Sequence, residues 1–404
     1  MNSFIARPWF VFFIGFILPF LMTKINFVST VGGMSEETEK IIYFSIVAYF
    51  LGLIFCYFFR YCLGGRISIN PLRDKVYVRN LSLLYLFLFS WFFLGAACLF
   101  YEFHVLGGIP VLSGNVEELR FNVQVNGYVH LLAISLGIVS TLFVVSASFF
   151  SGLKKVVFLF FGGLGFVFLA LTGNRSDSML CLVVIFLYFM FKGGVMLRAR
   201  YFLFGSFILL AFVLLKFYRE VAYGVDYIGM IESQLVGQPS FVKYIFYPLY
   251  MTLTYGYMVL DMLVNAGAEG MGGGRYTFYA FYSLIPGPQV DFGVFKNELL
   301  GIDFYAELTS TVVSNFYVDF GLVGVCLCVF IMAIVLGAVF SVARKNNKYA
   351  VLYAVLYLHT LIFFYVYIYV YLFAIIHVLI YLFYCFFFLG VERDVCVSRK
   401  VSGC

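Results

Sequence analysis

Long runs of apolar residues, separated by short polar stretches, dominate the hydrophobic pattern of this chain. A helix needs roughly 20 mostly apolar residues to cross the hydrocarbon core of a bilayer. No run alternates in the way that a barrel strand does, so we expect an all-α polytopic membrane protein with about ten transmembrane helices. The predicted spans lie near 9–28, 41–59, 80–101, 128–150, 156–172, 178–192, 201–218, 320–341, 349–368 and 370–389.

Composition supports this class and excludes others. Hydrophobic residues make up 64% of the 404 positions and charged residues only 11%, against about 25% charged residues in an average soluble domain. A water-soluble globule of this composition would lack the polar surface that keeps it dissolved. A soluble enzyme and a nucleic-acid binder are therefore excluded as function classes. The 53 phenylalanines and 32 tyrosines fit side chains that lie at lipid and headgroup depth.

The connections between the predicted helices alternate in charge. Cytoplasmic loops of membrane proteins carry an excess of lysine and arginine, so we assign the basic connections to the cytoplasm. Both termini then lie in the cytoplasm, which agrees with an even number of spans. The basic residues on that side are Arg7, Arg60, Arg66, Arg73, Lys75, Arg79, Lys154, Lys155, Lys192, Arg198, Arg200, Arg344, Lys345, Lys348, Arg393, Arg399 and Lys400.

A long segment, 219–308, falls on the external side between the seventh and eighth predicted spans. It contains an apolar stretch, 244–264, that is long enough for an eleventh crossing. A crossing there would turn the basic stretch 344–348 outward, so we predict a helix that lies on the outer leaflet or dips into it. Together with a second external loop, 102–127, the long segment forms the expected active-site face of a single integral membrane domain, 1–404.

The nine cysteines predict neither a disulfide scaffold nor a metal site. They lie in apolar runs, beside basic loops or in the C-terminal tail, and no pair has CxxC spacing. No cluster of histidines and acids has the spacing of metal ligands, and no phosphate-binding loop of the nucleotide type occurs. We expect no metal and no cofactor, so the energy for a reaction would come from the substrate or from an ion gradient.

Charged residues at the external face are the first candidates for chemistry, because charges in or beside a membrane are costly. Arginine suits a planar, two-pronged grip on a phosphate or diphosphate, although each arginine could equally be an interfacial anchor. Arg175 stands where a helix would begin, a place that favours an anion, and Arg275 follows three glycines whose N–H groups can cradle an oxyanion. The candidate diphosphate-binding residues are Arg120, Arg175, Arg219 and Arg275.

An external carboxylate or histidine is the expected general base, because an apolar wall can raise the pKa of a carboxyl group towards neutrality. Glu307 is preferred, since apolar residues flank it and Asp319 follows at the membrane entry. A histidine inside a span more often pairs with a neighbouring helix. The candidate catalytic residues are Glu307, His130, His377 and Asp319.

Three stretches resemble the Wzy-type O-antigen polymerases, the oligosaccharide repeat-unit polymerase family. The first, 108–127, contains Gly-Ile-Pro-Val-Leu-Ser-Gly and then Glu-Glu-Leu-Arg-Phe. The second is Leu-Thr-Gly-Asn-Arg at 171–175, and the third is Glu-Leu-Thr-Ser at 307–310 followed by Tyr-Val-Asp-Phe-Gly-Leu-Val-Gly at 317–324. The layout, with many spans and one large external loop before the C-terminal helices, is similar over most of the chain.

The resemblance implies a membrane glycosyltransferase with a GT-C-like architecture at the periplasmic face of the bacterial inner membrane. Such an enzyme transfers a growing glycan from undecaprenyl diphosphate to the sugar of a newly arrived lipid-linked repeat unit. Its partners would be the two lipid-linked substrates, membrane lipid, a chain-length regulator and a flippase. Carried onto this chain, the resemblance assigns Arg120, Arg175 and Arg219 to the diphosphate, with Arg275 as a weaker fourth, and an external acid or histidine to the base.

Two alternative functions stay open at this point. An O-antigen ligase would use the same donor and topology but transfer the glycan to the lipid A core. A flippase or transporter for lipid-linked sugars belongs to a different class and would need charged residues throughout the membrane interior. The predicted spans are almost free of charge, and the polar residues gather at one face, which favours chemistry at a surface.

Overall fold

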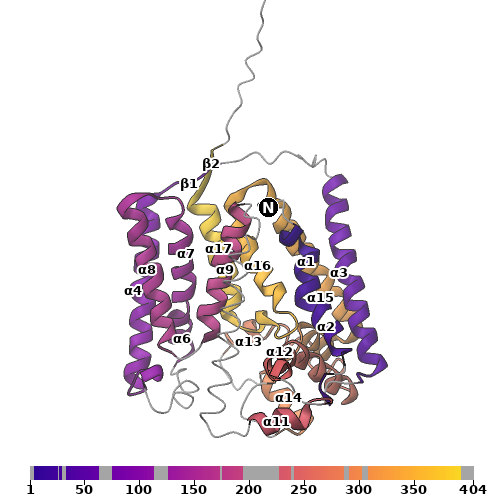
Figure 1. Ribbon diagram of the computed structural model, residues 1–404. Coiled ribbons are helices and arrows are strands. Elements are labelled where there is room, and N and C mark those ends of the chain that lie inside the picture. The colour runs from indigo at the N-terminus through magenta and orange to yellow at the C-terminus, as the bar shows by residue number, and fades with distance from the viewer. Residues whose placement is uncertain are drawn as a thin grey trace, which may run out of the picture.

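The computed structural model describes residues 4–25, 27–29, 33–62, 75–112, 126–172, 175–193, 227–237, 241–285, 291–302 and 308–392. These residues are almost entirely helical, and the helices stand side by side in one bundle (Figure 1). Of the described helices, five segments are long and apolar enough to cross a membrane. They are α3 (Glu36–Cys62), α4 (Leu81–Val105), the pair α6 (Gly127–Ile134) and α7 (Leu136–Ala147), α8 (Gly152–Ala170) and α15 (Val312–Lys345). The predicted all-α polytopic membrane class is confirmed.

Shorter apolar elements complete the bundle. The first predicted span is a nearly continuous helical run, and three other short helices match the sixth, ninth and tenth predicted spans. The seventh predicted span, 201–218, lies outside the described residues. The short elements are η1 (Phe4–Ala6), α1 (Pro8–Phe12), the π-helical turn η2 (Phe13–Ile17), α2 (Leu18–Thr23), α9 (Arg175–Gly193), α16 (Ala350–Leu361) and α17 (Leu372–Phe387).

The helices form two groups with a middle layer between them (Figure 1). On one side α4, α6, α7 and α8 pack together, and on the other side α1, α2, α3 and α15 do. In the middle layer α16 contacts α9 on one side and α1 and α15 on the other. Every residue from Ala350 to Thr360 is buried. A helix that is enclosed on all sides needs no polar face, which explains why the apolar run in this part of the sequence is uninterrupted.

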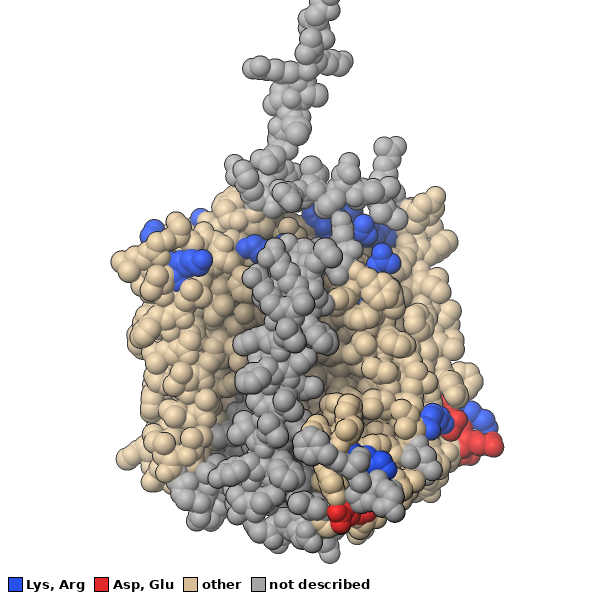
Figure 2. All heavy atoms as spheres, in the orientation of Figure 1, with Lys and Arg blue, Asp and Glu red and all other residues tan. Residues whose placement is uncertain are grey.

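Charge distinguishes the two ends of the bundle. Lysines and arginines gather at the end that carries the N-terminus, here called the basic end, and the acids in view lie at the opposite end (Figure 2). Arg60 lies in the last turn of α3, and Arg344 and Lys345 end α15. The opposite end carries α6 and three short helices of the long external segment (Figure 1). These are α11 (Tyr227–Gln234), α13 (Tyr279–Tyr282) and α14 (Phe292–Leu300).

A pair of short strands at the basic end was not predicted. Strand β1 (Lys75–Val78) pairs antiparallel with β2 (Leu389–Glu392), in the register Val76↔Val391. The ring of Tyr77 lies over Gly390, where a Cβ atom would be 2.5 Å from it. Four residues are too few for a periodicity signal beside 20-residue apolar runs. The pair ties the connection before α4 to the chain after α17.

The last helical hairpin differs from its prediction, because α16 ends at Leu361 and not near residue 368. Twelve helical residues rise only about 18 Å. The turn that follows contains η6 (Ile368–Val370). In this turn the N–H of Phe364 donates to the carbonyl of Gly15, in the middle of the first apolar segment, at 3.0 Å. The turn therefore lies at mid-depth in the bundle and not at its outer surface.

Helix α12 (Phe241–Asn265) contains the stretch 244–264, which we expected at the outer leaflet. Its tyrosine hydroxyls donate to main-chain carbonyls of the first segment: Tyr257 to Phe16 at 2.6 Å and Tyr250 to Ile25 at 2.9 Å. The helix lies with α11 and α14 at the end opposite the basic end (Figure 1). These contacts bind α12 to the first segment near this end of the bundle. That this end is the outer side stays a prediction from the charge pattern.

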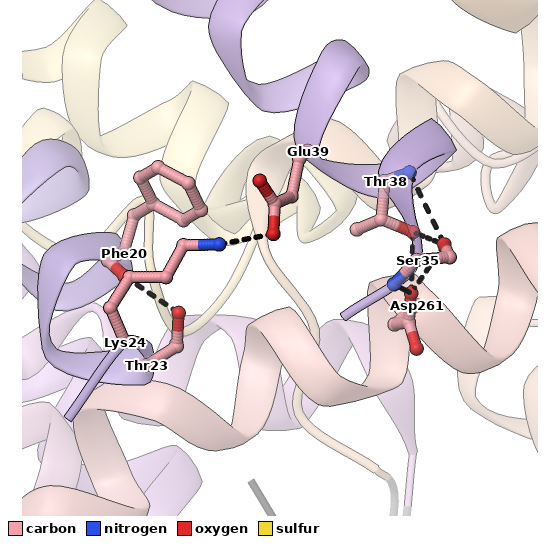
Figure 3. A network of polar contacts seen from close by, with 7 residues as sticks. All are labelled: Phe20, Thr23, Lys24, Ser35, Thr38, Glu39 and Asp261. Atoms are coloured by element: carbon pink, nitrogen blue, oxygen red, sulfur yellow. Dashed lines mark hydrogen bonds and ion pairs between the residues drawn. The ribbon is translucent and has the colours of Figure 1, made fainter. Parts of the chain in front are cut away.

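A carboxylate of α12 fixes this helix to the beginning of α3 (Figure 3). Asp261 Oδ1 accepts hydrogen bonds from the backbone N–H of Ser35 at 2.9 Å and from the hydroxyls of Ser35 and Thr38, each at 2.7 Å. A negative charge is favourable at a helix N-terminus. Beside it, Lys24 at the end of α2 forms an ion pair with Glu39 of α3. The successive helices α2 and α3 and the distant helix α12 are thereby joined at one end.

Candidate functional site

A cavity of about 890 Å³ lies at the end opposite the basic end. Its walls come from the beginning of α6, from α9, α13 and α14, from residues 308–310 before α15, and from the turn between α16 and α17. Because Phe364 of this turn is bonded to Gly15, the cavity is bounded at mid-depth of the bundle. A molecule in this cavity could therefore extend from mid-depth of the bundle to the end opposite the basic end.

The lining is mostly aromatic and aliphatic, with a few polar side chains. Ligand sites typically combine an apolar wall with a small number of placed polar groups. Asn315 is 1% exposed, and its Nδ2 has no hydrogen-bond partner among the described residues. A buried amide without a partner is costly, so a ligand oxygen is the expected partner. The other polar and aromatic lining residues are Asn126, Tyr128, His130, Tyr279, Ser283, Phe292, Lys296, Thr309, Ser310, Tyr365, Tyr367, Tyr371 and Phe373.

His130 lies in the first turn of α6 and lines the cavity. The side chain of Asn126 caps this helix by accepting from the N–H groups of Tyr128 at 3.0 Å and Val129 at 3.4 Å. Behind the imidazole is Glu102, near the end of α4, which is fully buried. The Nδ1 of His130 is 3.2 Å from Oε1 and 3.4 Å from Oε2 of this carboxylate. A predicted site residue thus has a buried acidic partner that the sequence analysis did not identify.

Lys296 is the second polar group that the sequence analysis did not select. Asp291 caps the beginning of α14 through the N–H of Val294, and Gly301 ends the helix in the left-handed conformation. Lys296 is 1% exposed and donates to the carbonyl of Leu308 and to the hydroxyl of Ser310. Its ammonium also lies 4.7 Å from the centroid of the Phe292 ring.

Asp319 and the glycine-rich turn before Arg275 lie against each other. The carboxylate of Asp319 accepts from the N–H groups of Tyr276, at 3.2 Å, and Thr277. A Cβ atom at Gly272 would be 2.0 Å from Asp319 Oδ1. The backbone amides that follow the glycines thus face a carboxylate of the chain itself, and Arg275 is exposed. Burial raises the pKa of the nearby Tyr276 phenol, which keeps it neutral.

The same region contains a break in α15. Gly321 has φ 65° and ψ −164° inside the helix, a conformation open in practice only to glycine. The N–H of Leu322, freed by this break, donates to the carboxylate of Glu269 at 3.1 Å. The segment Val312–Phe320 is therefore a separate short helix, and the motif Tyr-Val-Asp-Phe-Gly marks its end.

His377 lies away from the cavity lining, on α17. It is 3% exposed, and its ring centroid is 5.9 Å from that of His359 on α16. His359 Nδ1 is 3.1 Å from the hydroxyl of Tyr369. The Nε2 atoms of both histidines have no partner among the described residues. The structure thus places one predicted histidine at the cavity and the other, buried, between α16 and α17.

Four predicted site residues lie wholly or partly outside the described structure. Arg120, Arg219 and Glu307 lie outside the described residues, as does the side chain of Arg175. Arg175 is the first residue of α9, and Met179 and Leu180, about one turn further on, line the cavity. Leu308, directly after Glu307, lines it as well. In the described part of the chain, no three His, Cys, Asp or Glu side chains are grouped so that they could hold a metal ion.

The arrangement combines an imidazole with a buried carboxylate, a lysine and an open amide in one aromatic cavity. Such a site can bind a saccharide by stacking and hydrogen bonding and can accept a proton from a hydroxyl. Only weak sequence patterns pointed to Glu102 and Lys296, the two site residues that the sequence analysis missed. Glu102 is a single acid at the edge of an apolar run, and Lys296 is one of several external cations.

The O-antigen polymerase family model matches residues 5–366, which is most of the chain. No curated protein and no solved structure matches the chain.

Proposed function

Because the chain belongs to the O-antigen polymerase family, we propose that it lengthens a surface polysaccharide by joining whole lipid-linked repeat units. The donor is the growing glycan on undecaprenyl diphosphate, and the acceptor is a sugar hydroxyl of a new lipid-linked unit. The donor carries its own leaving group, so the transfer uses neither a nucleotide nor a metal. The reaction takes place at the periplasmic face of the inner membrane, with both termini in the cytoplasm. A flippase supplies the units, and a chain-length regulator is a further partner.

The cavity opposite the basic end is the observation that carries this proposal. It is about 890 Å³, which is within the range of small-molecule sites, and is lined by aromatic rings with a few polar groups. Its boundary at the depth of Gly15 suits a sugar that remains attached to a lipid in the outer leaflet. The amide of Asn315, which has no partner among the described residues, suits a sugar hydroxyl. Holding two lipid-anchored substrates in one place supplies the orientation that a transfer needs.

The arginines have an electrostatic role on this proposal. Arg120, Arg175 and Arg219, with Arg275 as a weaker fourth, neutralise the diphosphate as the bond to the sugar breaks. Loss of one such contact typically lowers the rate by about 10²–10³-fold. Arg175 has the best structural support, because it begins the helix whose next turn lines the cavity.

A gel of surface polysaccharide from a deletion strain tests the function. With the gene removed, we expect core with a single repeat unit, and a full ladder when the gene is restored. Core without any repeat unit would contradict the polymerase and indicate a ligase or a flippase. Arg344→Gln, at the basic end, is the matched control for arginine variants and should keep the ladder.

The role of Arg175 is tested by two substitutions in the restored strain. Arg175→Ala should lose long chains at normal protein level. Arg175→Lys should be nearly as poor, because lysine keeps the charge but not the two-pronged grip. A normal ladder from the lysine variant would show that Arg175 is an interfacial anchor.

A further inference from the structure

The pairing of His130 with Glu102 gives the cavity a defined proton acceptor. Imidazole Nδ1 faces both carboxylate oxygens, at 3.2 and 3.4 Å. A carboxylate at this nitrogen holds the ring proton there and leaves the lone pair on Nε2. Because His130 lines the cavity, Nε2 is the ring nitrogen left for a bound molecule.

Burial of Glu102 adds an independent argument. Its side chain is completely buried near the end of α4. Burying a carboxylate is costly unless a cation or hydrogen bonds compensate it, and His130 is the partner recorded for it in the described structure. A carboxylate of this kind stabilises the imidazolium that forms when the ring accepts a proton.

We propose that His130 is the base that deprotonates the acceptor hydroxyl and that Glu102 is its positioning residue. This inference rests on the proposed polymerase function and assigns the proton transfer within it. It favours His130 over Asp319 and His377. Asp319 already accepts two backbone N–H groups, and His377 is outside the cavity lining.

The step is balanced without a further reactant. The acceptor hydroxyl gives its proton to Nε2 of His130, and its oxygen forms the new bond to the anomeric carbon of the donor glycan. The bond between that carbon and the diphosphate oxygen breaks, and its electron pair leaves with undecaprenyl diphosphate. The imidazolium, held by Glu102, then releases its proton to water.

The test measures polymer synthesis by membranes that contain each variant, with lipid-linked repeat unit extracted from the deletion strain as substrate. His130→Gln should lower kcat by about 10²–10⁴-fold. Glu102→Gln should lower kcat by up to about 10⁴-fold, as for a carboxylate that holds the tautomer of a working imidazole, with KM changed less than threefold. Glu102→Asp should recover part of the loss. His104→Gln is the matched control, because His104 is exposed on the same helix as Glu102.

Normal kcat in His130→Gln, or a Glu102→Gln variant that alters only KM, overturns the assignment. If Glu102→Gln does not accumulate, His130 and Glu102 are both replaced by leucine, which removes the buried charge together with its partner. Polymer synthesis by that double variant would also overturn the assignment of His130 as the base. Failure of the proposed function looks different, since the wild-type chain itself would then make no polymer from this substrate.

Discussion

Asp319 and Gly321 lie two residues apart at the break in α15. Asp319 fixes the backbone there through hydrogen bonds, and Gly321 through its own conformation. The Asp319 carboxylate binds the turn at Tyr276 and Thr277 through their N–H groups. Gly321 takes a left-handed conformation, and a Cβ atom there would be 2.5 Å from Glu269 Oε1. Together they orient the short helix Val312–Phe320, which carries Asn315 at the cavity. Both residues therefore act on the shape of the site.

Gly321→Ala should lower the free energy of unfolding by about 1–3 kcal/mol, the usual cost of a side chain in a region open only to glycine. The measurement is thermal unfolding of the detergent-solubilised protein. Gly163→Ala on α8 is the control, because a Cβ atom there has nothing within 4 Å. Equal unfolding temperatures for the two variants would contradict the strain at Gly321.

Asp319→Asn separates a structural from a chemical role. An amide NH₂ cannot accept from a backbone N–H, so at least one of the two bonds is lost, at a cost of about 1–3 kcal/mol. We expect a lower unfolding temperature together with reduced polymer length. An Asp319→Asn protein that is as stable as wild type yet inactive would instead favour Asp319 as the base.

At the scale of elements, α12 and α16 show how backbone contacts decide where a helix lies. The apolar run of 349–389 predicts two spans, but its length cannot reveal that α16 ends at Leu361. That end depends on the close approach of Leu361 and Phe364 to Gly15, more than 300 residues earlier in the sequence. Hydropathy predicted most of the long helices. The outer position of α12 stays a prediction from the charge pattern. The strand pair and the short hairpin depend on contacts that no local pattern contains.

The candidate site could be predicted only in part, because it too depends on contacts between residues that are distant in sequence. His130 was identified because it is a histidine on the external side, and Leu308–Ser310 belong to a motif that the sequence analysis singled out. Glu102 can be recognised as a site residue only through its contact with His130, which is 28 residues away on another helix. Lys296 depends on the carbonyl of Leu308 in the same way. Residue type predicts candidates, whereas tertiary packing decides which of them meet.

Asp261→Ala should loosen α12 from the beginning of α3. The variant removes an oxygen that accepts from Ser35 and Thr38, and we expect a loss of about 1–3 kcal/mol. Hydrogen exchange should rise in α12 and in the first turn of α3. Asn265→Ala is the control, because its exposed bond to Asp261 Oδ2 should contribute within about 0.5 kcal/mol. Unchanged exchange in Asp261→Ala would contradict this anchor.

At the scale of the whole molecule, charge and cavity lie at opposite ends of one bundle. Basic residues begin α8 and end α3 and α15, and the cavity lies between α6, α9, α13 and α14 at the other end. A surplus of lysine and arginine keeps a loop in the cytoplasm. The cavity should therefore face the periplasm, where a lipid-linked sugar is presented after it has crossed the membrane.

Thiol labelling in whole cells tests this orientation. In a chain whose native cysteines are replaced, Ser283→Cys places a thiol at an exposed position of the cavity rim, and Lys154→Cys places one at the basic end. A charged maleimide that enters the periplasm but does not cross the inner membrane should label Ser283→Cys and leave Lys154→Cys unlabelled. Opening the membrane with detergent should then label both equally, because both positions are exposed. The reverse pattern would place the cavity in the cytoplasm. The arginines at the basic end would then face outward, and the donor would have to be a substrate that has not yet crossed the membrane.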